Sequence, residues 1–365
     1  VNYRLVIFKD TINYICLYVA YRACVKLSIH MFANNFRRVL SAACHQRTFT
    51  KVSLASYSRV QPSKFQFGNF RISAMAYSVE PRGAPNSLDY RLFFRNSGGQ
   101  VISPFHDIPL YADKENQILN MVVEVPRWTN AKMEIDTAAP MNPIKQDVKK
   151  GKLRFVRNCF PHHGYIWNYG AFPQTWEDPN HTDASTKCKG DNDPLDVCEI
   201  GRKVAKRGEV IQVKVLGTLA MIDEGETDWK IFAIDVTDPL AKDMNDIDDI
   251  RRLMPGFLEA SVNWFKIYKV PDGKPLNEFA FNEEPKNREF AMGIVNETSG
   301  QWQKLISGES DAGKLSCQNV TVDSSKYKVS SAEAQAEFDK AAPVADLIPR
   351  DPEVDNNNHF VNTKA

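Results

Sequence analysis

Short runs of alternating hydrophobic and polar residues fill the middle of the chain and predict β-strands. Residues 89–95 and 100–104 flank an Asn-Ser-Gly-Gly turn, and residues 121–127 and 131–135 flank Trp128-Thr-Asn. Both pairs predict hairpins. In the last run Lys132 and Glu134 are two residues apart and therefore share a face, while Met133 and Ile135 share the other.

Two further runs alternate well, at residues 209–216 and 229–236. Gly217 predicts a bulge before the first of them continues to Ile222. Many short antiparallel strands in series predict a closed barrel.

Helical periodicity begins later in the chain. Residues 246–253 predict a short acidic helix, residues 257–268 a second that stops at Pro271-Asp-Gly, and residues 290–305 a longer third. After about residue 308 Ser, Lys, Ala and Asp dominate, and we expect an extended or disordered tail. The fold class is mainly β with α (α+β), with extended terminal segments.

Charge divides the chain into unequal parts. Residues 1–79 carry 11 Lys and Arg against one acid, Asp10, and the remaining residues carry 35 basic and 44 acidic side chains. An acidic body argues against nucleic acid as a partner and favours metal ions. The apolar run at residues 15–20 is too short to span a bilayer.

From Thr11 to Val79 the leader is Arg-rich and acid-free, which is typical of a mitochondrial presequence, here beginning at Met31, and Met75 could start a form without it. A basic tail without a targeting role is the alternative. We expect the protein to reside in the cytoplasm or the mitochondrial matrix, depending on which start codon is used. The seven scattered cysteines favour such a reducing compartment. The expected domains are a leader at 1–79, one catalytic domain at 80–308 and a tail at 309–365.

The most informative motif is Gly190-Asp-Asn-Asp-Pro-Leu-Asp-Val-Cys-Glu-Ile-Gly201, which places Asp191, Asp193 and Asp196 within six positions. Two carboxylates 4 Å apart repel each other by about 4 kcal/mol at an effective dielectric near 20. Oxygen ligands without nearby His or Cys favour Mg²⁺ over zinc or copper. An acidic surface loop is the alternative explanation.

A second acidic motif, residues 223–228, follows about thirty residues later. Gly225 lets the chain reverse, so Asp223 ends one strand, Asp228 opens the next, and Lys230 shares the face of Asp228. With the first motif it predicts a site for several magnesium ions, although alone it resembles ordinary surface. Lys132, Arg154 and Lys269, near Glu134, Tyr165, Tyr169 and Tyr268, would then hold a tetra-anionic substrate. No nucleotide-binding glycine loop occurs.

These motifs resemble those of the soluble family I inorganic pyrophosphatases of eukaryotic type. The resemblance runs from about Tyr90 to Ile306 and includes Glu124-Val-Pro-Arg-Trp-Thr-Asn-Ala-Lys-Met-Glu134 and Pro161-His-His-Gly-Tyr-Ile-Trp-Asn-Tyr169. It implies a small five-stranded OB-like closed β-barrel with flanking helices, a homodimer, and hydrolysis of inorganic pyrophosphate to two orthophosphates.

The resemblance also implies the roles of single residues. Asp191, Asp196, Asp223, Asp228 and Glu134 would hold three to four Mg²⁺ ions with substrate, for which Mn²⁺ or other divalent ions can substitute. Asp193 would take the proton of the attacking water. The substrate would be bound by Lys132, Arg154, Tyr169, Lys230, Tyr268 and Lys269, with Glu124 and Tyr165 at the rim.

Two other functions stay open at this stage. One is a magnesium phosphohydrolase for organic substrates, which would need a groove for the organic group. The other is a non-catalytic subunit of a larger assembly that retains the fold.

Overall fold

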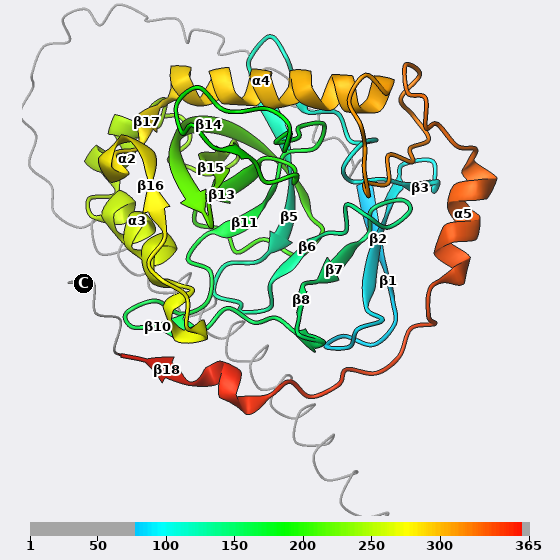
Figure 1. Cartoon of the computed structure of the whole chain (residues 1–365), viewed down its shortest axis with the longest axis horizontal. Helices are drawn as coiled ribbons and strands as arrows, with labels where there is room; N and C mark the ends of the chain where they lie inside the picture. The colour runs from blue at the N-terminus through cyan, green and yellow to red at the C-terminus, as the bar shows by residue number, and fades with distance from the viewer. Residues whose placement is uncertain (1–76, 360–365) are drawn as a thin grey trace, which may run out of the picture. The chain divides into compact units, whose positions relative to one another are not determined.

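A closed barrel of five strands forms the centre of the computed structural model, which describes residues 77–359. Neighbours around the barrel are β5 (Ile118–Val125), β11 (Asn168–Ala171), β13 (Asp196–Glu199), β15 (Glu226–Asp235) and β14 (Val210–Asp223), and β14 pairs back onto β5. All these pairs are antiparallel except β13 with β15. The predicted five-stranded closed barrel is confirmed (Figure 1).

The bulge predicted at Gly217 lies in the longest strand. The pairing of β14 with β15 shifts its register between Val215 and Gly217. A Cβ atom at this position would stand 2.5 Å from the Lys286 carbonyl oxygen and 2.6 Å from the Ile247 side chain. The barrel wall therefore touches its neighbours at a point where only glycine fits.

Three helices cover the barrel, as the periodicity predicted. Helix α4 (Arg288–Ser307) packs Ala291, Ile294 and Val295 against one set of strand side chains. Helices α2 (Ile247–Leu253) and α3 (Phe257–Ile267) pack against another set, where the Phe265 ring stacks on Trp167 at 4.6 Å. Because side chains alternate along a strand, the two faces of the barrel wall supply these two clusters.

A second sheet contains β1 (Tyr77–Arg82), β2 (Arg91–Asn96), β3 (Val101–Ile102), β6 (Met133–Ile135) and β7 (Ile144–Gln146). The predicted hairpin around residue 97 is confirmed as β2 with β3. The predicted hairpin around Trp128 is wrong, since β6 pairs with β7 instead. A strand has two edges, and those of β5 are taken by β14 on one side and by β11 and β4 (Tyr111–Asp113) on the other.

Short elements complete the description. They are β8 (Val148–Lys149), β9 (Lys152–Leu153), β10 (Asn158–Cys159), β12 (Lys189–Gly190), β16 (Glu278–Phe279), β17 (Lys286–Asn287), β18 (Asn357–Asn358), and the 3-10 turns η1 (Val270–Asp272), η2 (Ala280–Glu283) and η3 (Pro352–Asp355). No helix within residues 77–359 combines the length and the apolar character that a bilayer crossing needs. The presequence predicted from Met31 lies outside the described residues.

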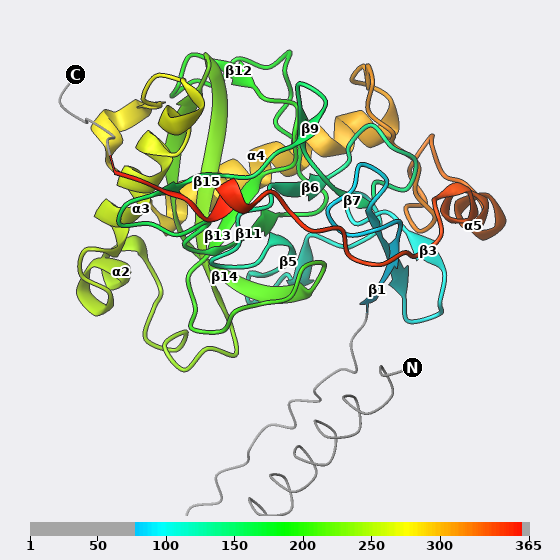
Figure 2. The same cartoon turned by 90° about the horizontal axis from the view of Figure 1, so that it is seen from below.

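The segment after residue 308 differs from the expected extended or disordered tail. Residues 331–340 form helix α5, capped by Ser330 and Glu333, and its Phe338 ring packs edge-on against Phe93 of β2 at 5.2 Å. Beyond α5 the chain is extended and passes β1 before it ends beside β10 (Figures 1 and 2). The polar composition misleads because a few apolar side chains, Phe338 and Val354 among them, are buried against the sheet and β10.

Candidate active site

One open cavity of about 780 Å³ lies on the barrel and gathers side chains from eight separate segments. All fourteen site residues predicted from the sequence line it: Glu124, Lys132, Glu134, Arg154, Tyr165, Tyr169, Asp191, Asp193, Asp196, Asp223, Asp228, Lys230, Tyr268 and Lys269. The tertiary structure thus brings the two acidic motifs and the scattered cations to one place.

Strand geometry explains how the two acidic motifs meet. Asp196 is the first residue of β13, which lies parallel to β15, and its register partner there is Lys230. Asp223 ends β14 and Asp228 lies two residues into β15, across the tight turn containing Gly225. The predicted reversal at Gly225 is confirmed, and its φ of 91° is one that glycine readily adopts.

Three carboxylates come close enough to share one metal ion. Glu177, Asp191 and Asp228 each offer an oxygen, and these oxygens lie within 4.8 Å of one another. Oε2 of Glu177 is buried without a hydrogen-bond partner, and Oδ1 of Asp228 touches the Lys230 ammonium outside hydrogen-bond geometry. A set of buried, under-coordinated carboxylate oxygens fits a hard divalent cation.

Burial and mutual repulsion act on the protonation of this cluster. Burial raises the pKa of Glu177 and of Asp191 well above the ordinary range, and the charges of the neighbouring carboxylates raise both further. Burial also raises the pKa of Asp228, although the Lys230 ammonium opposes this shift. Without a cation the cluster therefore holds protons more tightly than free carboxyl groups do.

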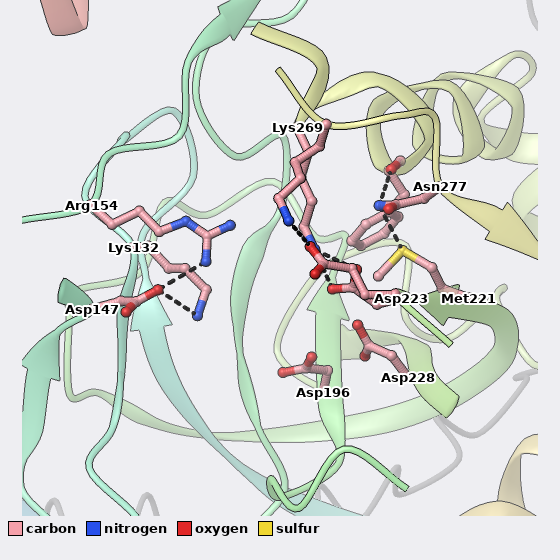
Figure 3. A network of polar contacts seen from close by, with 12 residues as sticks. Lys132, Asp147, Arg154, Asp196, Met221, Asp223, Asp228, Lys269 and Asn277 are labelled. Atoms are coloured by element: carbon pink, nitrogen blue, oxygen red, sulfur yellow. Dashed lines mark hydrogen bonds and ion pairs between the residues drawn. The ribbon is translucent and has the colours of Figure 1, made fainter. Parts of the chain in front are cut away.

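The remaining predicted metal ligands are paired with lysines in this structure. Lys230 contacts Asp196 as well as Asp228, and it donates a hydrogen bond of 2.9 Å to the Tyr169 hydroxyl. That hydroxyl in turn donates to Oδ2 of Asp196 at 2.5 Å. Asp223 contacts Lys269 (Figure 3).

The opposite wall of the cavity carries cations organised around one acid (Figure 3). Nη1 of Arg154 lies 2.9 Å from Oδ2 of Asp147, and Nζ of Lys132 lies 3.4 Å from the same oxygen. Lys132 also pairs with Glu134 at 2.5 Å, which confirms that these two side chains share a face. The shared Asp147 carboxylate therefore holds the Lys132 ammonium and the Arg154 guanidinium side by side at the cavity.

Asp193 lies in the loop before β13, close to both walls. Its backbone N–H donates to Oδ1 of Asp191 at 3.0 Å, which turns the loop. The packed surroundings raise the pKa of the Asp193 carboxyl, and the negative charge of Glu134 raises it further. Because the Asp193 side chain keeps access to solvent, hydration of its charged form reduces this rise in pKa.

Aromatic hydroxyls and one buried acid complete the rim. Burial raises the pKa of Tyr165, Tyr169 and Tyr268, so their hydroxyls remain protonated donors at neutral pH. The Trp264 ring holds two of them, stacking on Tyr268 at 4.7 Å and tilting against Tyr165 at 5.0 Å. Oε1 of Glu124 accepts the Ile135 N–H at 2.7 Å, which ties β5 to β6.

Sequence reasoning missed two acids, Glu177 and Asp147. Glu177 lies in a loop between β11 and β12, fourteen residues before Asp191, and no local pattern marks it. It reaches the cluster because its backbone N–H donates to the Asp193 carbonyl and its Oε1 accepts the Trp229 N–H. Asp147 precedes Arg154 by seven residues, across the β8–β9 hairpin, a relation that only the hairpin reveals.

Comparisons with known proteins all indicate one family. Residues 121–303 match the family model described as inorganic pyrophosphatase. An inorganic pyrophosphatase of Bos taurus is 60% identical over 273 residues, covering 75% of this chain and 91% of that protein. One from Drosophila melanogaster is 62% identical over 259 residues, covering 71% of this chain and 77% of that protein.

Solved structures are similar as well. The inorganic pyrophosphatase from Schistosoma japonicum superposes with a TM-score of 0.74 at 50% identity, covering 78% of this chain and 100% of that one. A truncated vacuolar soluble pyrophosphatase of Trypanosoma cruzi, solved in complex with PPi, superposes with a TM-score of 0.59 at 36% identity, covering 72% of this chain and 98% of that one.

Proposed function

This chain belongs to the inorganic pyrophosphatase family and is a hydrolase of inorganic pyrophosphate, and we propose that it works with magnesium ions and with Asp193 as general base. The observation that supports this proposal is the division of one cavity into an acidic wall and a cationic wall. A highly charged anion needs both, because metal ions neutralise one side of it while ammonium, guanidinium and hydroxyl groups bind the other.

The acidic wall is the proposed metal site. Asp191 and Asp228 line this wall and form the nucleus of the metal site with Glu177, whose carboxylate oxygen lies within 4.8 Å of theirs. Asp196 and Asp223 from the same wall and Glu134 from the opposite wall would complete it once Lys230, Lys269 and Lys132 bind substrate phosphates instead. Three to four Mg²⁺ ions with substrate are proposed, for which Mn²⁺ can substitute. Bound Mg²⁺ supplies charge neutralisation and lowers the pKa of a coordinated water.

The protein's own groups then perform three tasks. Asp193 accepts a proton from the attacking water, a role for which a carboxylate with raised pKa and solvent access is suited. Lys132 and Arg154 bind phosphate oxygens from the cationic wall, oriented by Asp147. Protonated hydroxyls and ammonium groups stabilise the departing phosphate, and they belong to Tyr169, Lys230, Tyr268 and Lys269.

The experiment that tests this proposal is a phosphate-release assay with titrated Mg²⁺. Pyrophosphate, nucleoside triphosphates and simple phosphate esters are compared as substrates at equal concentration. Magnesium-dependent release from pyrophosphate alone is the expected result. Comparable release from organic phosphates would favour the broader phosphohydrolase, and no release from any substrate would favour a non-catalytic subunit.

We propose a homodimer as the assembly. Trp128 is 58% exposed and adopts a positive φ of 64°, so a large aromatic ring is presented to solvent at a backbone conformation that costs energy. Exposed aromatic side chains of this kind are typical of protein interfaces. Light scattering on the intact protein tests the assembly, and Trp128→Ala is expected to shift it toward the monomer.

The domain limits and the compartment are also proposals. A catalytic domain at 80–308 contains every residue of the family match. The cytoplasm or the mitochondrial matrix is supported by the composition of the leader and by the scattered cysteines. N-terminal sequencing of the native protein distinguishes the two starts.

A further inference from the structure

The C-terminal segment runs along the catalytic domain as far as β10, whose first residue, Asn158, follows Arg154 by four positions. After α5 it is held to the loop that follows β1, where Gly83 N–H donates to the Ala342 carbonyl at 2.9 Å and Ile348 N–H to the Pro85 carbonyl at 3.1 Å. Figures 1 and 2 show its path from α5 to β18. Its last turn, η3 with β18, lies against β10.

Several contacts fix this last turn. Val354 is only 3% exposed. Strand β18 pairs in parallel with β10, the Phe160 N–H donates to the Asn358 carbonyl at 3.0 Å, and Nδ2 of Asn358 donates to the Asn158 carbonyl at 3.0 Å. The buried Val354 side chain and the hydrogen-bonded pair of β18 with β10 show that the last part of the segment is held against the domain.

Asn158 of β10 connects this segment to the site. Its side chain is buried, and its Nδ2 donates to the carbonyls of Val354 at 3.2 Å and Asn356 at 3.5 Å. Its Oδ1 accepts from Nδ2 of Asn130 at 2.7 Å and from the Gly164 N–H at 2.9 Å. Both amide protons of Asn158 therefore form hydrogen bonds to the tail, and its side-chain oxygen accepts two hydrogen bonds from the body of the domain.

The partners of Oδ1 lead directly to substrate-binding residues. Asn130 precedes Lys132 by two residues and exchanges backbone and side-chain hydrogen bonds with Val156. Lys132 N–H donates to the Arg154 carbonyl at 3.1 Å, so the backbones of the two cationic residues are linked directly. Gly164 precedes Tyr165, and a Cβ atom on Gly164 would stand 2.4 Å from the Thr129 carbonyl oxygen.

We propose that residues 351–359 act as a positioning segment that sets Lys132, Arg154 and Tyr165 for pyrophosphate through Asn158. This inference rests on the proposed roles of those three residues. Without the segment the Asn158 side-chain amide loses both of its carbonyl acceptors, and water takes their place. The Asn158 side chain is then no longer held in one orientation. The acidic cluster is built from β15 and from the loops flanking β12, so its metal binding is independent of this link.

The principal test is a chain that ends at Arg350. Its KM for magnesium pyrophosphate is expected to rise about tenfold, since small displacements of binding groups cost one to two orders of magnitude. Its affinity for Mn²⁺ without substrate, measured by calorimetry, is expected to match that of the intact chain. A synthetic peptide of residues 351–365, added at millimolar concentration, is expected to bring KM back toward the intact value.

Two point variants make the test specific. Asn158→Asp keeps the acceptor oxygen and removes both donors to the tail, so it is expected to raise KM in the same way. Lys340→Gln changes an exposed lysine of the tail that pairs with Glu337, and it is expected to leave KM unchanged. If the shortened chain does not fold, the variant Val354→Ala of the intact chain is tested in its place, and its KM is expected to rise in the same way.

An unchanged KM in the folded shortened chain would overturn the inference. So would a parallel loss of Mn²⁺ affinity, or a raised KM that the peptide does not lower, because both indicate general damage to the domain. An intact chain without pyrophosphatase activity would instead refute the proposed function.

Discussion

Asp196 and Lys230 are register partners on the parallel strands β13 and β15, and their side chains form an ion pair at the centre of the acidic wall. Lys230 is 3% exposed and also contacts Asp228. In the absence of a metal ion, this one ammonium group offsets the repulsion between two carboxylates from different strands.

Replacing Lys230 with methionine is therefore expected to destabilise the metal-free protein. Removing one partner of a buried ion pair costs about 3–5 kcal/mol. Millimolar Mg²⁺ is expected to recover part of this loss, because a cation then supplies the missing charge. Thermal unfolding with and without Mg²⁺ measures both effects. Lys328→Met, at an exposed lysine paired with Asp323, is the control, and an equal loss in both variants would contradict the argument.

Glu177→Gln is expected to weaken metal binding without unfolding the protein. The substitution keeps the shape of the side chain and the acceptor for the Trp229 N–H, but removes the charge of the Glu177 carboxylate. A loss of about 10- to 100-fold in Mn²⁺ affinity is expected, the range that loss of a partner group at a metal site produces. Calorimetry measures it. Glu297→Gln on nearby α4, where Glu297 pairs with His181, is expected to change nothing.

Asp193→Asn is expected to separate turnover from metal binding. If Asp193 is the general base, kcat falls by about 10²–10⁴-fold, the usual contribution of a positioned base. The Asp191 contact is made by the Asp193 backbone N–H and survives the change, so Mn²⁺ affinity and unfolding temperature stay close to those of the parent protein. Unchanged kcat would refute the assignment of the base.

His106 makes stability depend on pH away from the site. It is fully buried, its Nε2 donates to the Ser316 carbonyl, and its Nδ1 accepts the Trp302 indole N–H, so it is held as the neutral ring. Burial lowers its pKa to about 4, below the ordinary 6.5. Its contribution is full above pH 6.5 and is lost as pH falls toward 4, about 3 kcal/mol in total.

Unfolding temperatures between pH 7 and pH 4.5 measure this dependence. The variant His106→Gln cannot take up a proton, and it is expected to lose less stability than the parent protein over the same interval. Parallel curves for the two proteins would show that His106 does not contribute.

Gly190→Ala is expected to damage both the fold and the metal site. A Cβ atom at Gly190 would stand 2.4 Å from the carbonyl carbon and oxygen of Glu177, and the backbone of that residue would have to move. The control is Gly293→Ala in α4, where the space is open and alanine is expected to stabilise the helix by about 0.5–1 kcal/mol. Thermal unfolding and Mn²⁺ calorimetry of both variants test the contrast.

Particular elements show where prediction from sequence ends. Three barrel strands, β5, β14 and β15, the bulge at Gly217 and the helix that contains Trp264 follow from local periodicity, which depends on the few residues around each position. The other two barrel strands, β11 and β13, are only four residues long and were not predicted. The pairing of β6 with β7 does not, because the choice between two strand edges depends on which edges the rest of the sheet has already filled. Helix α5 was missed because its apolar face is only a few residues wide.

The amino-acid sequence by itself determined the longer barrel strands, the three helices that cover the barrel, the acidic motifs and fourteen of the residues that line the cavity, since hydrophobic periodicity, closely spaced charges and a family resemblance are properties of the chain order. Only the tertiary structure decided that Glu177 joins Asp191 and Asp228, that Asp147 orients Lys132 and Arg154, and that the tail reaches Asn158. The physical reason is that such contacts join residues far apart in the chain or across a turn. Their positions depend on how the whole chain packs, through the closure of the barrel, the register of its strands and the exclusion of water from the interior.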